Sequence, residues 1–196
     1  MAAGRKSKPA KGGTVTLKVT LRDTKPPVWR RLVLPDSMTL GGVSEAIQAA
    51  MGWDGGHLHM FEIGETRYGD LSFDEGEEGG MADENRLTLA GLRKSGVTRF
   101  HYIYDFGDNW EHMVEIEKPA TVPEGIAPPA CIAGRRACPP DDCGGPFGYH
   151  HLLEVLADPA HPDYRELRGW MDKTFDPEAF SVDTTNRALA ARFRGR

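Results

Sequence analysis

Residues 98–117 have the sequence TRFHYIYDFGDNWEHMVEIE, and this stretch decides the fold class. Aromatic residues occupy every second position from Phe100 to Tyr104, and the alternation resumes from Trp110 to Ile116. A period of two is typical of a strand with one buried face. The residues between the two runs, 105–109, are Asp-Phe-Gly-Asp-Asn, types that adopt tight-turn conformations. The stretch therefore predicts a β-hairpin.

The chain before the hairpin predicts more strands and one helix. Residues 14–22 alternate apolar and polar side chains, and residues 28–34 form a second extended run. Thr39 is a suitable N-cap for a helix that ends near Gly52. Short strands are expected at 57–63 and 66–68, and a further short element at 87–92.

Two segments are rich in turn residues, and helices are expected after the second. The acidic, glycine-rich segment 70–84 predicts a mobile loop, and residues 119–145 predict a long Pro/Gly/Cys loop. Apolar spacing then predicts three helices. The first spans 149–156, the second begins at Pro162 and has Trp170 on its buried side, and the last is capped by Asp183.

These elements predict an α+β protein. We expect a mixed, mainly antiparallel sheet with one early crossing helix and a helical C-terminal third. Residues 1–13 are expected to be a disordered basic arm, and 14–196 a single domain. Within that domain we expect a sheet-rich part (14–118), a loop (119–145) and a helical part (146–194).

Composition limits the class of function. The chain has 196 residues and a net charge of −5, with 29 acidic against 24 basic residues, so non-specific nucleic-acid binding is not expected. No apolar run approaches the roughly 20 residues of a membrane span, and the basic N-terminus lacks the apolar core of a secretion signal. Three cysteines suit a reducing compartment, so a cytoplasmic location is expected.

Four motifs carry a resemblance to a known family. They are the hairpin segment Tyr102–His112, the loop Cys138–Tyr149, the stretch from Gly52-Trp53 to His57-Leu-His-Met-Phe61, and Asp176–Phe180. Together they resemble the plasmid pRiA4b Orf-3-like family, over nearly the whole chain from Thr14 to Leu189. The resemblance implies an association with plasmids and other mobile elements, and it implies no established reaction. The family usually has Glu-Asp before its Gly-Gly, where this chain has Asp141-Asp142.

The cysteines offer one metal hypothesis. Cys131, Cys138 and Cys143 lie in one loop, with His150 just beyond. Three thiolates and an imidazole would make a tetrahedral zinc site. The spacing lacks a Cys-x-x-Cys pair, and the alternative is that these are small buried thiols.

Carboxylates and histidines offer a second hypothesis. Oxygen and imidazole ligands can bind a divalent metal that activates water, as in a metal-dependent hydrolase. The candidates are His57, His59, Asp105, Asp108 and His112. The alternative assigns Asp105 and Asp108 to turn amides, and Asp141 and Asp142 to the cap of the following helix.

The hypothesis that we favour is a non-enzymatic binding module for an unknown ligand or protein partner. Its surface would join the 105–112 hairpin to the 138–149 loop, with these residues on it: Asp105, Asp108, Trp110, His112, Asp141, Asp142 and Tyr149. A DNA-binding accessory of a mobile element is a third hypothesis, and it requires Arg30, Arg31, Arg135 and Arg136 to share a face. The hairpin aromatics could stack on bases, but few basic residues lie among them, so we expect a core face.

Overall fold

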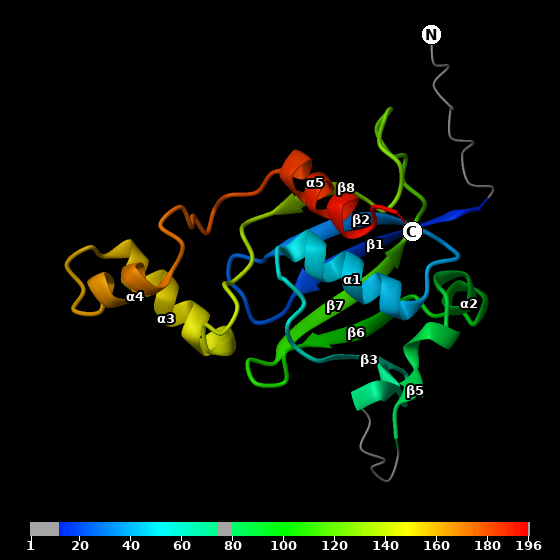
Figure 1. Cartoon of the computed structure of the whole chain (residues 1–196), viewed down its shortest axis with the longest axis horizontal. Helices are drawn as coiled ribbons and strands as arrows, with labels where there is room; N and C mark the ends of the chain where they lie inside the picture. Colours follow the sequence, from blue (N-terminus) through cyan, green and yellow to red (C-terminus); the bar gives the residue numbers. More distant parts are fainter. Residues whose placement is uncertain (1–11, 74–79, 196) are drawn as a thin grey trace.

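The computed structural model describes residues 12–73 and 80–195, and the strands in this part form one sheet (Figure 1). The strand order is β5-β4-β3-β6-β7-β1-β2-β8, and every neighbouring pair is antiparallel except β4 with β5. The strands are β1 Thr14–Leu21, β2 Trp29–Pro35, β3 His59–Ile63, β4 Thr66–Gly69, β5 Ala82–Asp83, β6 Arg99–Tyr104, β7 Trp110–Glu117 and β8 Ala130–Arg135. The predicted hairpin is β6–β7, and the predicted mixed, mainly antiparallel sheet is confirmed.

The helices divide into a group on the sheet and a projecting arm. They are α1 Leu40–Met51, α2 Leu89–Lys94, α3 Gly145–Ala157, α4 Tyr164–Trp170 and α5 Val182–Arg192. α1 crosses one face of the sheet and α5 lies beside α1 and β8, whereas α3 and α4 extend away from the sheet (Figure 1). The α+β class is confirmed. No helix in the described residues is long and apolar enough to cross a membrane.

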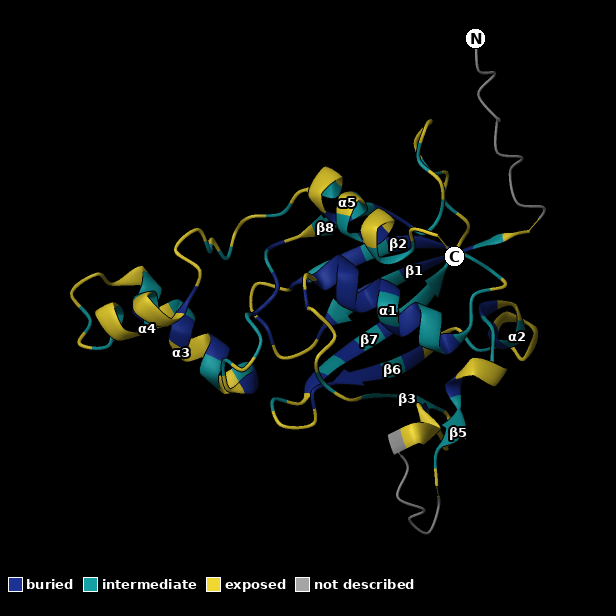
Figure 2. Cartoon of the chain, viewed as in Figure 1, coloured by how far each residue is buried: buried dark blue, intermediate teal, exposed yellow. Residues whose placement is uncertain are grey.

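The early crossing helix begins and ends where the sequence predicts. The Thr39 hydroxyl accepts a hydrogen bond from the Gly42 amide at 3.3 Å, and Gly52 ends the helix with a φ of 105°. A left-handed residue after the last turn is most easily glycine. Val43 and Ile47 are fully buried, and Figure 2 shows much of α1 in the colour of buried residues.

The sheet has one buried face and one charged face. Val15, Leu17 and the other apolar residues of β1 are at most 2% exposed, as their period of two predicts. On the other face, Lys18 pairs with Glu115 at 3.5 Å and Arg31 with Glu117 at 2.6 Å. These cross-strand pairs keep that face charged, and α1 covers the apolar one.

Four expectations about the C-terminal half need correction. Residues 119–145 contain the edge strand β8, which the short run Ala-Cys-Ile-Ala-Gly-Arg did not reveal because it has no clear alternation. Trp170 is 51% exposed, because α4 lies on the arm and buries none of its residues. The last helix is capped by Ser181, whose hydroxyl accepts from the Thr184 amide, and Asp183 lies in the first turn. The helix expected over 149–156 begins earlier, at Gly145. The helical C-terminal third itself is confirmed, and it consists of α3, α4 and α5.

The free edge of β8 is bonded to a side chain of α5. The Asn186 amide accepts a hydrogen bond from the Cys131 backbone N–H at 2.7 Å and donates one to the Cys131 carbonyl at 2.9 Å. The carboxamide therefore forms the two bonds that a neighbouring strand would form.

Two predicted segments lie partly outside the described residues. They are the basic arm, of which residues 1–11 are not described, and the acidic segment, of which residues 74–79 are not described. The ends of the acidic segment form a 3₁₀ turn, Leu71–Phe73, and the strand β5.

Candidate functional site

The turn between β6 and β7 is held by Asp105. One carboxylate oxygen accepts hydrogen bonds from the amides of Gly107 at 2.9 Å and Asp108 at 3.3 Å. Asp105 and Asn109 both adopt left-handed backbone conformations, with φ of 58° and 54°. The turn duty expected of Asp105 is confirmed, and its second oxygen remains available to other groups.

The loop before α3 contacts this turn, as the binding hypothesis expects. The Asp108 carboxylate accepts a hydrogen bond from the Gly144 amide at 3.2 Å. Gly145, with a φ of 65°, lies directly against the Asp108 carbonyl. On the inner side, the Trp53 indole N–H donates to the Pro139 carbonyl at 3.1 Å and stacks on Tyr104 at 4.6 Å between ring centres.

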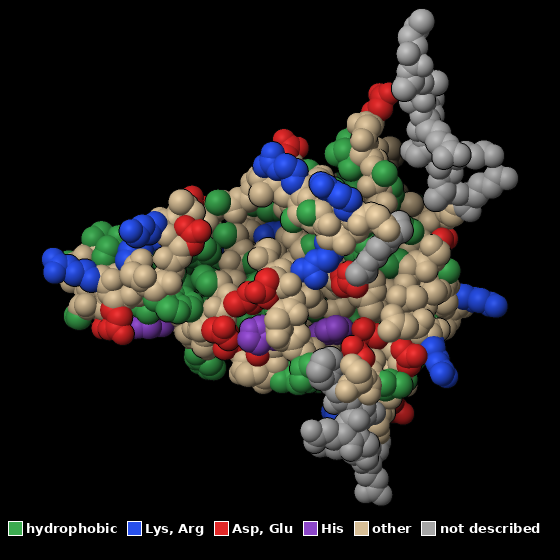
Figure 3. All heavy atoms as spheres, viewed as in Figure 1, with side chains coloured by type: hydrophobic (Ala, Val, Ile, Leu, Met, Phe, Trp, Pro, Cys, Tyr) green, Lys and Arg blue, Asp and Glu red, His purple; other side chains and the backbone are tan. Residues whose placement is uncertain are grey.

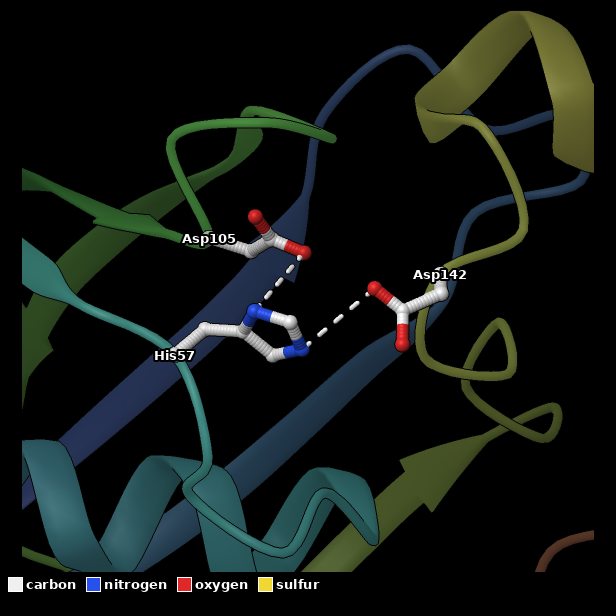
Figure 4. A group of neighbouring side chains, drawn as sticks. All are labelled: His57, Asp105 and Asp142. Carbon is white, nitrogen blue, oxygen red and sulfur yellow. Dashed lines mark ion pairs between the residues drawn. The ribbon is translucent and has the colours of Figure 1, made fainter.

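His57 lies between carboxylates from both segments (Figure 4). Its Nδ1 is 3.5 Å from an Asp105 oxygen, and its Nε2 is 3.6 Å from an Asp142 oxygen. One ligand atom from each of the three residues lies within 4.8 Å of the others, the only such group of at least three in the described residues. The Asp105 side chain is 8% exposed and fixed by the turn, whereas Asp142 is 73% exposed. We call these three residues the His57 cluster.

Asp141 adds a partly buried carboxyl beside the His57 cluster. Burial raises its pKa to about 6, and the charges of Asp54, Asp142 and Asp105 act in the same direction. Its Oδ1 is buried without a hydrogen-bond partner. A carboxyl with a pKa near 6 can exchange a proton close to neutral pH.

Tyr104 lies beneath the same carboxylates. Its side chain is fully buried, and its hydroxyl has no well-aligned hydrogen-bond partner. Burial raises its pKa to about 12, and the nearby charges of Asp141 and Asp54 add to the effect. The backbone amides of His57 and Gly55 lie beside the hydroxyl, and the His57 ring meets the Tyr104 ring edge-on at 5.7 Å. The Tyr104 hydroxyl therefore lies near the backbone of His57, on the inner side of this residue.

A cavity of about 660 Å³ opens beside His57, between α1 and β3. Histidine and acidic side chains gather across this face of the molecule, between the arm and β5 (Figure 3). Within the cavity lining, His59 is paired with the buried Glu84 at 2.8 Å. Ser44 and Gln48 also line it, and both bond the buried Tyr102 hydroxyl, at 2.9 and 3.0 Å.

Three residues expected on the ligand surface are buried instead. Trp110 and His112 are fully buried and Tyr149 is 1% exposed. The two β7 residues are on the strand face that packs inward, and Tyr149 is on the inner face of α3. His112 Nδ1 lies 3.2 Å from the Tyr102 carbonyl, and burial lowers the pKa of His112 to about 4. These residues support the site from within.

The expected zinc ligands do not converge. Cys131, in β8, directs its thiol at the Ala133 carbonyl, while His150 is exposed on α3. Burial raises the pKa of all three thiols, that of Cys143 to about 12. No three of the cysteines and His150 bring ligand atoms into one group. The reading as buried thiols fits Cys131 and Cys138, and Cys143 is half-buried.

The five-residue hydrolase set is scattered as well. His57 and Asp105 meet, but His59 pairs with Glu84, Asp108 holds Gly144, and His112 is buried. The expected caps are also different, because α3 begins at Gly144 with no side-chain cap from Asp141 or Asp142.

The basic face expected of a DNA-binding accessory is not formed. Arg30 is buried and donates to the Ala50 carbonyl at 2.9 Å, and Arg136 is buried against Glu178. Arg31 pairs with Glu117, which leaves Arg135 as the exposed member of the four. Of the hairpin aromatics expected to form a core face, Tyr102, Tyr104 and Trp110 are buried, whereas Phe106 is 47% exposed.

The hydrolase hypothesis joined His57 to Asp105, and the binding hypothesis joined Asp105 to Asp142, but neither set of candidate residues contained all three. Sequence reasoning did not identify Asp54, Tyr104 or Glu84 as parts of the site. The run Asp54-Gly-Gly-His57 is a sequence signal for Asp54, because adjacent glycines let the backbone approach other groups closely. Glu84 was obscured by its position at the end of an acidic stretch.

A family profile, a related protein and a solved structure each match most of the chain. The sequence profile described as plasmid pRiA4b ORF-3-like protein matches residues 13–184. The chain is 38% identical over 179 residues to uncharacterized protein y4hQ of Sinorhizobium fredii (strain NBRC 101917 / NGR234), covering 89% of this chain and 90% of that one. Its fold is similar to the crystal structure of MM3350, a protein of unknown function from Methanosarcina mazei Go1. That match has a TM-score of 0.77 and 35% identity, and it covers 87% of this chain and 96% of the other. The chain belongs to the plasmid pRiA4b ORF-3-like family.

Proposed function

We propose that this protein is a binding module for a small polar molecule. The ligand surface lies where the 105–108 turn and the 138–144 loop meet His57, and it opens into the cavity between α1 and β3. The observation that carries the proposal is that His57 belongs to both features: it lies between Asp105 and Asp142, and it lines the cavity of about 660 Å³. Cavities of several hundred Å³ with a few convergent polar groups are the usual form of small-molecule sites.

The cavity lining supports a ligand that has polar groups and an apolar face. Two large apolar side chains on the lining are exposed to solvent, Leu58 by 43% and Phe106 by 47%. Ser44 and Gln48 supply polar groups that are held in place by Tyr102. Apolar contacts would supply much of the affinity, while fixed polar groups would orient the ligand.

Ligand-observed NMR on the full chain tests this proposal. The library contains amino acids, amines, nucleotides, sugars and carboxylic acids, and EDTA is present so that metal ions play no part. We expect at least one class to bind, and Phe106→Ala to weaken it about 10-fold through lost apolar burial. Phe147→Ala is the matched control, because Phe147 is 89% exposed on α3 and does not line the cavity.

Two results would overturn the proposal. One is that no library class binds the wild-type chain. The other is that the ligands found bind Phe106→Ala and wild type equally, which would place them outside the cavity.

A further inference from the structure

We propose that the His57 cluster is a binding site for a divalent transition-metal ion, with His57, Asp105 and Asp142 as its protein ligands. The inference rests on the proposed function, because it names a ligand for the same surface. One imidazole and two carboxylates suit Zn²⁺ and Mn²⁺, the two ions used as probes below.

The spacing of the donor atoms fits a single ion. The three lie within 4.8 Å of one another. Bonds of about 2.0–2.2 Å require donors separated by roughly 3–4 Å, so one carboxylate must move until both face the same ring nitrogen. Asp105 is fixed by its bonds to the turn amides. Asp142 is 73% exposed on a loop, so it is the ligand that can move.

Only one nitrogen of His57 can bind the ion, and the ring now faces one carboxylate with each nitrogen. In that arrangement the ring can pair with both carboxylates at once. Metal binding would replace one of these contacts with a bond from the ring nitrogen to the ion. The competing explanation, that the cluster is a His–carboxylate ion pair and nothing more, is therefore open to test.

The surroundings supply a second, independent reason to place a cation here. The Tyr104 side chain is fully buried, and its hydroxyl lies beside the His57 and Gly55 backbone amides without a hydrogen bond of standard geometry. Asp141 presents a buried, unpartnered carboxyl oxygen beside the His57 cluster. Burial of polar atoms without partners is unfavourable, and such atoms collect at functional sites. A cation bound in the His57 cluster would offset the charge of the nearby Asp141 carboxylate. The Tyr104 hydroxyl would then serve as an outer partner that helps to orient the metal ligands.

The experiment measures Zn²⁺ and Mn²⁺ binding to the full chain. Protein purified without a metal-affinity tag is stripped with EDTA, dialysed, and titrated with each metal by calorimetry. Bound metal after gel filtration is measured by mass spectrometry. We expect one ion per chain, a loss of at least about 10-fold in affinity in Asp142→Asn, and a similar loss in His57→Gln.

The variants are chosen so that misfolding cannot imitate the result. Asn tolerates the left-handed backbone of Asp142, whose φ is 56°, and that side chain is exposed, so Asp142→Asn should fold as wild type. Asp163→Asn is the matched control, because Asp163 is also an exposed carboxylate 3.6 Å from a histidine, His151 on the arm. Its affinity for metal should equal that of wild type.

Three outcomes would overturn the inference. The first is no binding to the wild-type chain, which would favour the ion pair. The second is equal affinity in Asp142→Asn and wild type. The third is loss of zinc with Cys143→Ser but not with Asp142→Asn, which would place the ion on thiolates. Because the cavity experiment is run in EDTA, its failure and the failure of metal binding are observed separately.

Discussion

The Asp108 carboxylate accepts a hydrogen bond from the Gly144 amide at 3.2 Å, across 36 residues of chain. Gly144 is the N-cap position of α3, and its own side chain can offer no cap. The turn of the β6–β7 hairpin therefore supplies, from a distance, an acceptor for the N-cap amide, as the N3 Glu of a capping box does locally.

Asp108→Ala should destabilise the protein by about 0.5–2 kcal/mol, the usual cost of losing an N-cap acceptor. Urea unfolding followed by circular dichroism measures this change. Glu154→Ala on the exposed side of the same helix is the control, and it should be neutral. Equal stability of the two variants would mean that the bond across the junction contributes nothing.

Gly145→Ala should lower the free energy of unfolding by more than the strain of an alanine in a left-handed conformation explains. Gly145 has a φ of 65°, and a Cβ there would overlap the Asp108 carbonyl oxygen. Gly96→Ala is the control, since Gly96 has a φ of 78° and open space around it, so it should lose only about 1–2 kcal/mol. Thermal denaturation should give a lower midpoint for Gly145→Ala. Equal midpoints would show that the loop moves away freely.

Trp53→Phe should retain the ring packing on Tyr104 but leave the Pro139 carbonyl without its donor. We expect a loss of about 1–2 kcal/mol, because both groups are buried. Trp170→Phe is the matched control, since Trp170 is 51% exposed and makes no such bond among the described contacts. If the two variants unfold at the same urea concentration, the indole bond does not hold the loop.

Acid should destabilise the protein through His112. Burial lowers the folded-state pKa of His112 to about 4 from its ordinary value of 6.5, so the unfolded chain binds more protons between these values. The neutral, buried ring therefore makes its full contribution to the free energy of unfolding above pH 6.5. This contribution, roughly 3 kcal/mol in total, is lost as the pH falls towards 4.

Asp141 should act in the opposite direction over an overlapping range. Burial raises the folded-state pKa of Asp141 to about 6 from its ordinary value of 3.8, so the folded chain binds more protons between these values. Acid therefore relieves an unfavourable charge there, and Asp141→Asn should lose stability more steeply than wild type between pH 7 and pH 5. Urea titrations at both values measure the difference, with Glu154→Gln as the control. Parallel losses in wild type and Asp141→Asn would contradict this account.

The three thiols should react slowly in the folded protein. Burial raises the pKa of each of them, that of Cys143 to about 12, and a thiol reacts as its thiolate. Alkylation by iodoacetamide at pH 7.5, followed by mass spectrometry, should be at least about 100-fold slower than in denatured protein. Rapid labelling of the half-buried Cys143 alone would show that its loop opens frequently.

The local elements of this fold could be predicted because their signals are local. Thr39 and Gly52 mark the two ends of α1, and the alternation from Phe100 to Tyr104 marks β6. β8 was missed because its six residues include Cys, Ala and Gly, which carry little strand signal, and it is recognised only by its pairing with β2.

The site was harder to predict than the elements. The hairpin and the 138–149 loop are unusually rich in Gly and Asp. Because of this composition, their acidic residues were identified as candidates and the two segments were expected to be in contact. The partner that joins them, His57, lies 48 residues before Asp105 and 85 before Asp142, and no periodicity connects such positions. Burial of Trp110, His112 and Tyr149 likewise depends on which face packs inward, a property of the assembled sheet.

The bonds between Asn186 and Cys131 have a consequence for how copies of this protein meet. An open sheet edge invites a strand from another molecule, and exposed edges are a common route to aggregation. Here the carboxamide occupies the N–H and the carbonyl of Cys131, the second residue of the outermost strand β8. Another chain could pair along that part of the edge only by displacing α5, so the helix that completes the fold also keeps the sheet from growing.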